Sequence, residues 1–129
     1  MSVGKKKTAA GSRILIVEDT AAIAEVLQLK LKNSGFQPTI ANDGLQALKT
    51  LDTSTFDLIL LDLVMPHLDG FGVLEELKKR KTKTPVIVTS NLGQPEDIDR
   101  VKKFGVKDYF IKAEVPLTEM VGRIKKILA

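Results

Sequence analysis

The sequence predicts an α/β fold in which a single parallel β-sheet is covered by helices on both faces. Two observations lead to this prediction. Five short runs of apolar and β-branched residues alternate strictly with five stretches in which apolar residues recur at helical spacing. The connections between these segments are short, which is typical of parallel strands joined by crossover helices. The length of 129 residues suits one domain with its own hydrophobic core.

The predicted strands are apolar runs that end at polar residues. Residues 58–61 are all apolar, which favours a strand buried on both faces, and the run stops at Asp62, shortly before Pro66. Pro38 has no amide hydrogen, so the strand that contains it is expected near an edge of the sheet. The five strands are predicted at residues 13–17, 36–41, 58–62, 86–90 and 108–112.

The predicted helices begin and end at residues that favour helix termini. Thr20 precedes the first helix and Gly35 follows it, while Pro95 and Pro116 stand where the last two helices start. The apolar stripe of each helix is expected to face the sheet. The stripes consist of Ile23, Val26, Leu27 and Leu31; Leu45, Leu48 and Leu51; Phe71, Leu74 and Leu77; Ile98, Val101 and Phe104; and Leu117, Met120, Val121, Ile124 and Leu128.

Composition and charge narrow the possible functions. The absence of cysteine excludes disulfides and thiolate metal sites and is compatible with the cytoplasm, where we expect the protein. No apolar run approaches the roughly 20 residues of a membrane-spanning helix. Without Lys5, Lys6 and Lys7 the net charge of +4 falls to 17 basic against 16 acidic residues. Residues 1–12 are therefore interpreted as a flexible basic tail on a nearly neutral domain of residues 13–129. A solubilising tail is preferred to a nucleic-acid-binding arm, and no direct contact with nucleic acid or membrane is expected.

Polar residues collect at the carboxyl ends of four of the five predicted strands. They are Glu18 and Asp19, Asp62, Thr89 and Ser90, and Lys112. In open α/β sheets, ligands bind beyond this edge of the sheet. The sequence therefore predicts a functional site where these strand ends meet.

The residue types at these strand ends favour phosphoryl chemistry with a divalent cation. Three neighbouring carboxylates repel one another unless a cation joins them, and Mg²⁺ prefers carboxylate and phosphate oxygens. Asp62 can act as a nucleophile that forms an aspartyl phosphate, and Lys112 can hold the transferring phosphoryl oxygens. The simpler alternatives are a helix cap for Asp19, an exposed loop acid for Asp62 and a surface lysine for Lys112.

Three further polar features have simpler explanations. Thr89 and Ser90 are neighbours in a strand and point to opposite faces, so only one can face the site, and the strand-end position favours Ser90. The alternative for Ser90 is a turn or cap hydroxyl. His67, the only histidine, is interpreted as an exposed loop residue. The basic run of residues 78–83 suits the end of a helix, where cations interact favourably with the macrodipole.

Four blocks of sequence, in this order, resemble the receiver domain of two-component response regulators, the CheY-like family. The blocks are Ile16-Val17-Glu18-Asp19; Asp62-Leu63-Val64-Met65-Pro66 followed by Asp69-Gly70; Pro85-Val86-Ile87-Val88-Thr89-Ser90; and Asp108-Tyr109-Phe110-Ile111-Lys112. The resemblance covers about residues 13–128. It implies a flavodoxin-like (βα)5 three-layer sandwich whose five parallel strands lie in the order 2-1-3-4-5.

The resemblance also implies a role for the residues at the strand ends. Asp62 is the expected phosphoacceptor. Glu18, Asp19, Asp62 and the main-chain carbonyl of Val64 are the expected Mg²⁺ ligands, and Lys112 matches the lysine that contacts the phosphoryl group. A sensor histidine kinase or a phosphotransfer protein is the expected donor.

The resemblance further implies a switch. Ser90 matches the switch hydroxyl and Tyr109 the aromatic residue whose rotamer reports phosphorylation, although Tyr109 could instead be a half-buried strand aromatic. The surface formed by residues 95–105, 108–112 and 116–128 is expected to control a protein partner. The protein is expected to be a monomer or weak homodimer, and to assist its own phosphorylation and slow dephosphorylation without being a turnover enzyme.

This chain departs from the family pattern at several positions. Ala113 stands where the family usually has proline, often in cis, and Asn91 replaces a small residue after the switch hydroxyl. Val64 and Leu92 are apolar at positions that influence dephosphorylation, so slow loss of the phosphoryl group is expected. Two alternatives remain: a phosphorylation-independent pseudo-receiver, and a haloacid-dehalogenase-type phosphatase. The phosphatase would need a second aspartate at the position of Val64.

Overall fold

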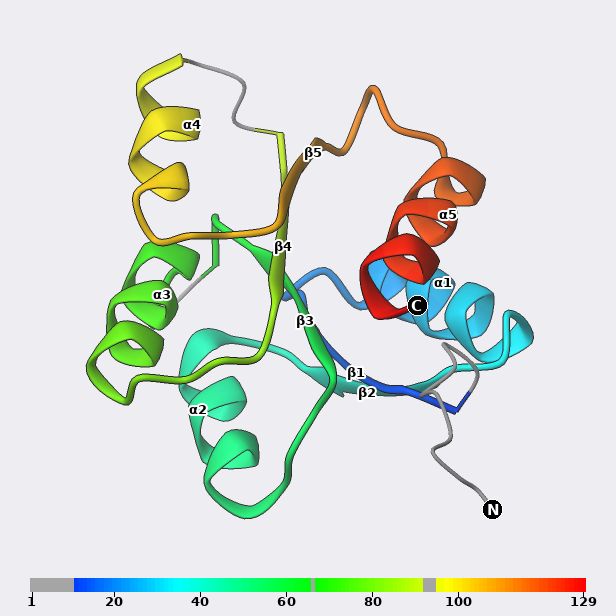
Figure 1. The fold of residues 1–129 in the computed structure, drawn as a ribbon, viewed down its shortest axis with the longest axis horizontal. Coiled ribbons are helices and arrows are strands. Elements are labelled where there is room, and N and C mark those ends of the chain that lie inside the picture. The colour runs from blue at the N-terminus through cyan, green and yellow to red at the C-terminus, as the bar shows by residue number, and fades with distance from the viewer. Residues whose placement is uncertain (1–10, 66, 92–94) are drawn as a thin grey trace.

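A computed structural model of the chain describes residues 11–65, 67–91 and 95–129. Within these residues, strands and helices alternate from one end of the domain to the other (Figure 1). The elements are β1 (Arg13–Val17), α1 (Ala21–Asn33), β2 (Gln37–Ala41), α2 (Gly44–Thr53), β3 (Leu58–Asp62), α3 (Gly70–Lys79), β4 (Val86–Ser90), α4 (Pro95–Lys102), β5 (Asp108–Ile111) and α5 (Leu117–Leu128).

The five strands form one parallel sheet in the order β2-β1-β3-β4-β5, which confirms the flavodoxin-like fold class. The strand that contains Pro38 lies at an edge, as predicted. Asp62 pairs in register with Thr89, and Ser90 pairs with Ile111, the residue before Lys112. The carboxyl ends of β3, β4 and β5 therefore meet at one rim of the sheet.

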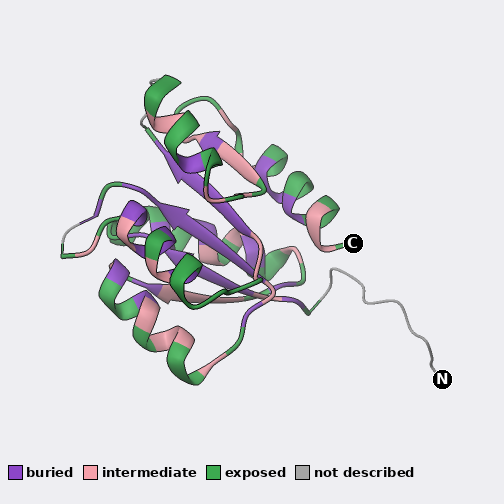
Figure 2. Ribbon diagram, turned by 60° about the vertical axis from the view of Figure 1, so that its left-hand side comes forward, coloured by how far each residue is buried: buried purple, intermediate pink, exposed green. Residues whose placement is uncertain are grey.

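The sheet is the middle of three layers. Helices α2, α3 and α4 lie on one side of it, and α1 and α5 lie on the other (Figure 1). Each side has its own apolar cluster, because alternate strand residues point to opposite faces. Every residue of β3 and β4 is buried, and the exposed surface belongs mainly to the outer faces of the helices (Figure 2). This double coverage explains the unbroken apolar runs in the central strands.

Two aspartates begin the helices that flank β3. The side chain of Asp43 accepts a hydrogen bond from the amide of Gln46 at 2.8 Å, and that of Asp69 accepts one from the amide of Gly72 at 2.9 Å. Each satisfies a backbone donor that the first helical turn leaves unpaired. Gly70 follows at a very close approach of two chain segments, since a Cβ there would lie 2.4 Å from the carbonyl oxygen of Asp62. The start of α3 is thus packed directly against the end of β3.

The phase of two helices differs from the prediction. Ile23 and Val26 of α1 and Leu45 of α2 were expected to face the sheet, but their exposed fractions are 38%, 52% and 52%. The small side chains of Ala24 and Ala47 are buried instead. Alanine lets a helix backbone approach the sheet closely, so a stripe chosen by side-chain size alone is rotated away from the buried face.

The amino-terminal boundary of the domain is well packed. Residues 1–10 of the predicted tail lie outside the described residues. The amide of Gly11 donates to the carbonyl of Gly35 at 2.7 Å, and the buried Ser12 accepts from the amide of Gln37 at 2.9 Å. The last two residues assigned to the tail therefore contact β2 and the turn that precedes it. No helix among the described residues is both long and apolar enough to span a bilayer.

Candidate functional site

Three carboxylates converge at the rim formed by the ends of β1 and β3. Glu18 and Asp19 directly follow β1, and Asp62 is the last residue of β3. Each offers a carboxylate oxygen, and these oxygens lie within 4.8 Å of one another. Glu18 and Asp62 are buried, with exposed fractions of 1% and 4%, whereas Asp19 is exposed. The strand ends thus hold two acids away from water and leave the third at the opening.

Lys112 lies between the two buried carboxylates. Its Nζ is 2.5 Å from Oε1 of Glu18 and 3.4 Å from Oδ1 of Asp62. Its backbone amide donates to the carbonyl of Ser90 at 2.8 Å, which extends the pairing of β5 with β4 and fixes the direction of the side chain. One ammonium group therefore contacts two carboxylates of a cluster of three, and the cluster keeps an excess of negative charge.

The pKa of Asp62 shows the effect of this excess. Burial, and next the charge of Glu18, raise the pKa of Asp62 from 3.8 to about 6, although Lys112 acts in the opposite direction. An all-oxygen set of carboxylates with uncompensated charge fits a hard divalent cation such as Mg²⁺. Such a cation would supply the missing positive charge and would polarise the oxygens of a phosphoryl group.

Val64 and Ala113 lie next to the charged groups. The amide of Val64 donates to Oδ1 of Asp62 at 3.4 Å, and the Val64 side chain is exposed at the opening of the site. Among the described residues no peptide bond is cis, so the bond between Lys112 and Ala113 is trans. Leu92, the second apolar residue expected to influence dephosphorylation, lies outside the described residues.

Ser90 and Thr89 point to opposite layers of the fold. Ser90 is fully buried and its side chain hydrogen-bonds that of Tyr109. Burial raises the pKa of Tyr109, and the bond to Ser90 lowers it. Tyr109 packs against the apolar cluster beneath α2, α3 and α4. Thr89 instead lines a groove formed by α1 and α5. Ser90 and Tyr109 therefore form a pair between the rim and the α4 side of the sheet.

The groove beside Thr89 is a feature that the sequence analysis missed. It has a volume of about 330 Å³, lies between α1 and α5, and reaches Lys112. Ile23 and Val26, assigned by sequence to the core, form part of its wall. The sequence did contain an indication of this apolar surface, because residues 21–24 and 26–27 contain more apolar side chains than one helix face can bury. His67 lies exposed in the loop after β3, as predicted.

A model of the response regulator receiver domain matches residues 14–125 of this chain. The chain belongs to the response regulator receiver domain family. It is 36% identical over 118 residues to the alkaline phosphatase synthesis transcriptional regulatory protein PhoP of Bacillus subtilis, covering 90% of this chain and 48% of PhoP. It is 34% identical over 116 residues to the cell cycle response regulator CtrA of Brucella ovis, covering 90% and 50%. The receiver thus spans about half the length of these curated relatives.

Solved receiver domains have the same fold. The receiver domain of a Francisella response regulator superposes with a TM-score of 0.85 at 33% identity, covering 92% of this chain and 97% of that one. The response regulator TrrA of Thermotoga maritima, solved in complex with Mg²⁺-BeF, has a TM-score of 0.80 at 28% identity, with coverage of 91% and 99%. The TrrA complex therefore shows a Mg²⁺-bound state in a receiver of this fold.

Proposed function

We propose that this receiver accepts a phosphoryl group on Asp62 from a phosphohistidine in a partner protein, with Mg²⁺ as the cofactor. Glu18, Asp19, Asp62 and the main-chain carbonyl of Val64 would hold the ion, which supplies positive charge against the phosphoryl oxygens. The observation that carries the proposal is the buried Asp62, whose pKa is raised to about 6 although Lys112 lies 3.4 Å away. The uncompensated negative charge at Asp62 favours binding of a divalent cation, and that cation would in turn offset the negative charge of an incoming phosphoryl group.

The transfer is an in-line displacement at phosphorus. An oxygen of Asp62 forms the new bond to phosphorus while the bond between phosphorus and the donor's imidazole nitrogen breaks, and the imidazole leaves as the neutral ring with its proton on the other nitrogen. Lys112 contacts Glu18 before transfer and is within reach of oxygens carried by Asp62, where it would hold the new negative charge. The protein thus provides positioning and charge, which are the main needs of phosphoryl transfer.

The output would pass through Ser90 and Tyr109. A hydroxyl drawn toward the phosphoryl group would break its hydrogen bond with Tyr109 and change the rotamer population of that ring. The consequence would be a shifted α4-β5-α5 surface that binds a downstream protein, with no direct contact with nucleic acid. We propose that the protein works in the cytoplasm as a monomer or weak homodimer.

The groove between α1 and α5 supports a helical phosphodonor, namely a sensor histidine kinase or a phosphotransfer protein. It is apolar and it is continuous with Lys112, so a donor seated there would lie next to Asp62. Val26→Glu should therefore slow transfer from a phosphotransfer protein about tenfold and leave transfer from acetyl phosphate unchanged. Leu45→Glu is the matched control, because Leu45 is equally exposed at 52% but lies on α2. Equal loss in both variants would contradict this position of the donor.

Mass spectrometry tests phosphorylation itself. Incubation with Mg²⁺ and acetyl phosphate should add one phosphoryl group of about 80 Da to the protein. Asp62→Ala should abolish the adduct, whereas Asp99→Ala, on an exposed position of α4, should retain it. The absence of an adduct, or its persistence in Asp62→Ala, would refute the proposal. Titration with Mg²⁺ alone separates the pseudo-receiver alternative, which predicts no binding.

A further inference from the structure

A second pocket lies at the opposite rim of the sheet, where β4 and β5 begin. It has a volume of about 450 Å³ and is bounded by the end of α3, the connection from α3 to β4, and the turn before β5. β4 has five residues, so at 3.3 Å per residue this rim lies roughly 13 Å from the end that carries Ser90. Its wall combines four lysines with apolar side chains, and the residues include Leu77, Lys78, Lys81, Lys83, Val86, Phe104 and Lys107.

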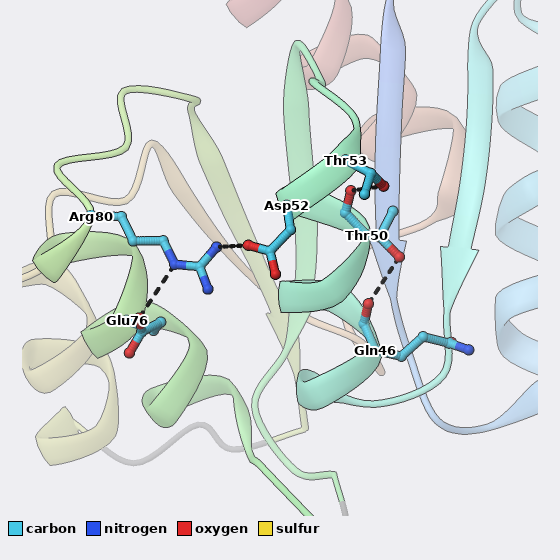
Figure 3. Close-up of polar contacts among 6 residues, drawn as sticks. All are labelled: Gln46, Thr50, Asp52, Thr53, Glu76 and Arg80. Atoms are coloured by element: carbon cyan, nitrogen blue, oxygen red, sulfur yellow. Dashed lines mark hydrogen bonds and ion pairs between the residues drawn. The ribbon is translucent and has the colours of Figure 1, made fainter.

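The basic run at the end of α3 divides into two groups with different surroundings. Arg80 turns toward α2, where its Nη1 lies 2.8 Å from Asp52 and its Nε lies 3.3 Å from Glu76 (Figure 3). Lys78, Lys81 and Lys83 line the pocket instead. The helix macrodipole explains a cation at the end of α3, but it does not explain why three lysines of one run surround the same hollow.

The positive charge of the pocket is not compensated by ion pairs among the residues that the structure describes. All four of its lysines are exposed, and none forms an ion pair with another described residue. The lining contains no acidic residue. Lys78 instead lies over the ring of Phe104, with its Nζ 5.9 Å from the ring centroid. The pocket therefore offers four ammonium groups to a ligand.

Lys81 adds a second observation. Its φ of 55° places it in the left-handed region just after α3, where glycine or asparagine is favoured. The following amide, that of Thr82, closes the helix end by donating to the carbonyl of Leu77 at 3.0 Å. This closure uses only backbone groups, so the helix end does not need the lysine side chain. A lysine in the left-handed region is costly for the fold, yet it gives the pocket one of its charges.

The apolar floor of the pocket favours an acidic peptide over a nucleic acid as the ligand. Leu77 and Val86 are nearly buried, and Phe104, Pro85 and Val106 are partly exposed to the pocket. A nucleic acid backbone would gain little from an apolar floor, and arginine is the residue that matches phosphate bidentately. An apolar side chain flanked by carboxylates would use both the floor and the lysines.

We propose that this pocket binds an acidic segment of a partner protein, with one apolar side chain of that segment seated on Leu77, Val86 and Phe104. The lysines contact the flanking carboxylates. Because the pocket lies at the rim opposite Asp62, the partner can remain bound while the phosphorylation site is accessible. Binding at this pocket therefore needs no contact with Asp62, the phosphoacceptor in the function proposed above.

Fluorescence anisotropy with the full chain tests the proposal. The probe is a short labelled peptide in which one phenylalanine is flanked on both sides by aspartates, and the comparison peptide has serine in place of phenylalanine. We expect saturable binding of the probe at low ionic strength, weakened about tenfold by the loss of the phenylalanine. Lys81→Glu/Lys83→Glu should weaken binding at least tenfold. Lys125→Glu/Lys126→Glu, which changes net charge equally on exposed positions of α5, should leave it within about twofold.

Several outcomes would overturn the proposal. No saturable binding, equal loss in both double variants, equal affinity for the serine peptide, or tighter binding of a DNA duplex than of the probe would each do so. Asp62→Ala should bind the probe as the unchanged protein does, which separates this site from the proposed phosphoacceptor. Lys81→Gly controls for loss of binding through unfolding. It should raise the urea midpoint of the protein and weaken its binding of the probe. A rise in stability with unchanged binding would also overturn the proposal.

Discussion

Replacing Asp62 by asparagine should stabilise the protein in the absence of divalent cations. The pKa of Asp62 is raised from 3.8 to about 6 by burial and by Glu18, so ionisation of this group opposes folding. A shift of about two pH units corresponds to about 3 kcal/mol at 1.36 kcal/mol per unit. This figure already includes the opposing attraction of Lys112, and asparagine loses part of the fit of a protonated acid. We therefore expect a gain of about 2 kcal/mol in the free energy of unfolding at neutral pH.

The pH dependence distinguishes this cause from a general packing effect. The folded pKa lies above the unfolded one, so the folded protein binds this proton more tightly than the unfolded chain does. The penalty is fully present above about pH 6, declines as the pH falls toward 3.8, and is absent below that value. The advantage of Asp62→Asn should decline over the same range.

Urea denaturation in EDTA, followed by far-UV circular dichroism, measures the free energy of unfolding of the variant and of the parent at about pH 7.5 and at about pH 4. Asp99→Asn is the control for loss of one exposed carboxylate and should change stability little at either pH. Added Mg²⁺ should stabilise the unchanged protein more than the Asp62→Asn variant. An Asp62→Asn variant no more stable than the parent at pH 7.5, or equally stabilised at both pH values, would refute the reasoning.

Three further predictions concern the same rim. Gly70→Ala should lower the free energy of unfolding by about 2 kcal/mol and slow phosphorylation, because the added Cβ would lie 2.4 Å from the carbonyl oxygen of Asp62. Urea denaturation measures the loss of stability, and the rate of adduct formation measures the effect on phosphorylation. The aspartyl phosphate should persist for many minutes, and Val64→Glu should shorten its lifetime by offering an acceptor for the attacking water, as followed by mass spectrometry; a lifetime of seconds in the parent would contradict this. Ser90→Ala should raise the pKa of Tyr109 further by removing its hydrogen bond, and because the chain has one tyrosine and no tryptophan, ultraviolet absorbance reports this titration directly.

The sequence predicted the charged rim of the sheet for one physical reason. A residue such as Asp62 is costly at the end of an apolar strand unless other groups compensate it, so its position carries information. The same reasoning located Glu18 and Lys112. In the structure Lys112 forms ion pairs with both Glu18 and Asp62. Their roles in phosphoryl transfer stay predictions until the variants are measured.

The sequence was less informative where a residue's environment depends on three-dimensional packing. Ile23 and Val26 have the spacing of buried residues, yet Ala24 takes the buried position because it allows a closer approach of α1 to the sheet. Lys81 gave no sequence signal for its left-handed conformation, since glycine is the usual residue there. The basic residues of the run 78–83 could be placed near a helix end, but the sequence could not separate Arg80, which forms ion pairs, from the lysines that line the pocket.

The opposite orientations of Thr89 and Ser90 connect the rim of the sheet to both layers of helices. Thr89 belongs to the layer of α1 and α5, and Ser90, through Tyr109, belongs to the layer of α2, α3 and α4. A donor seated in the proposed groove would contact α1 and α5, whereas Ser90 and Tyr109 belong to the other layer. If both proposals hold, substitutions on α1 would change donor recognition without contacting Ser90 or Tyr109, whereas substitutions on α5 would affect the groove and the proposed output surface together.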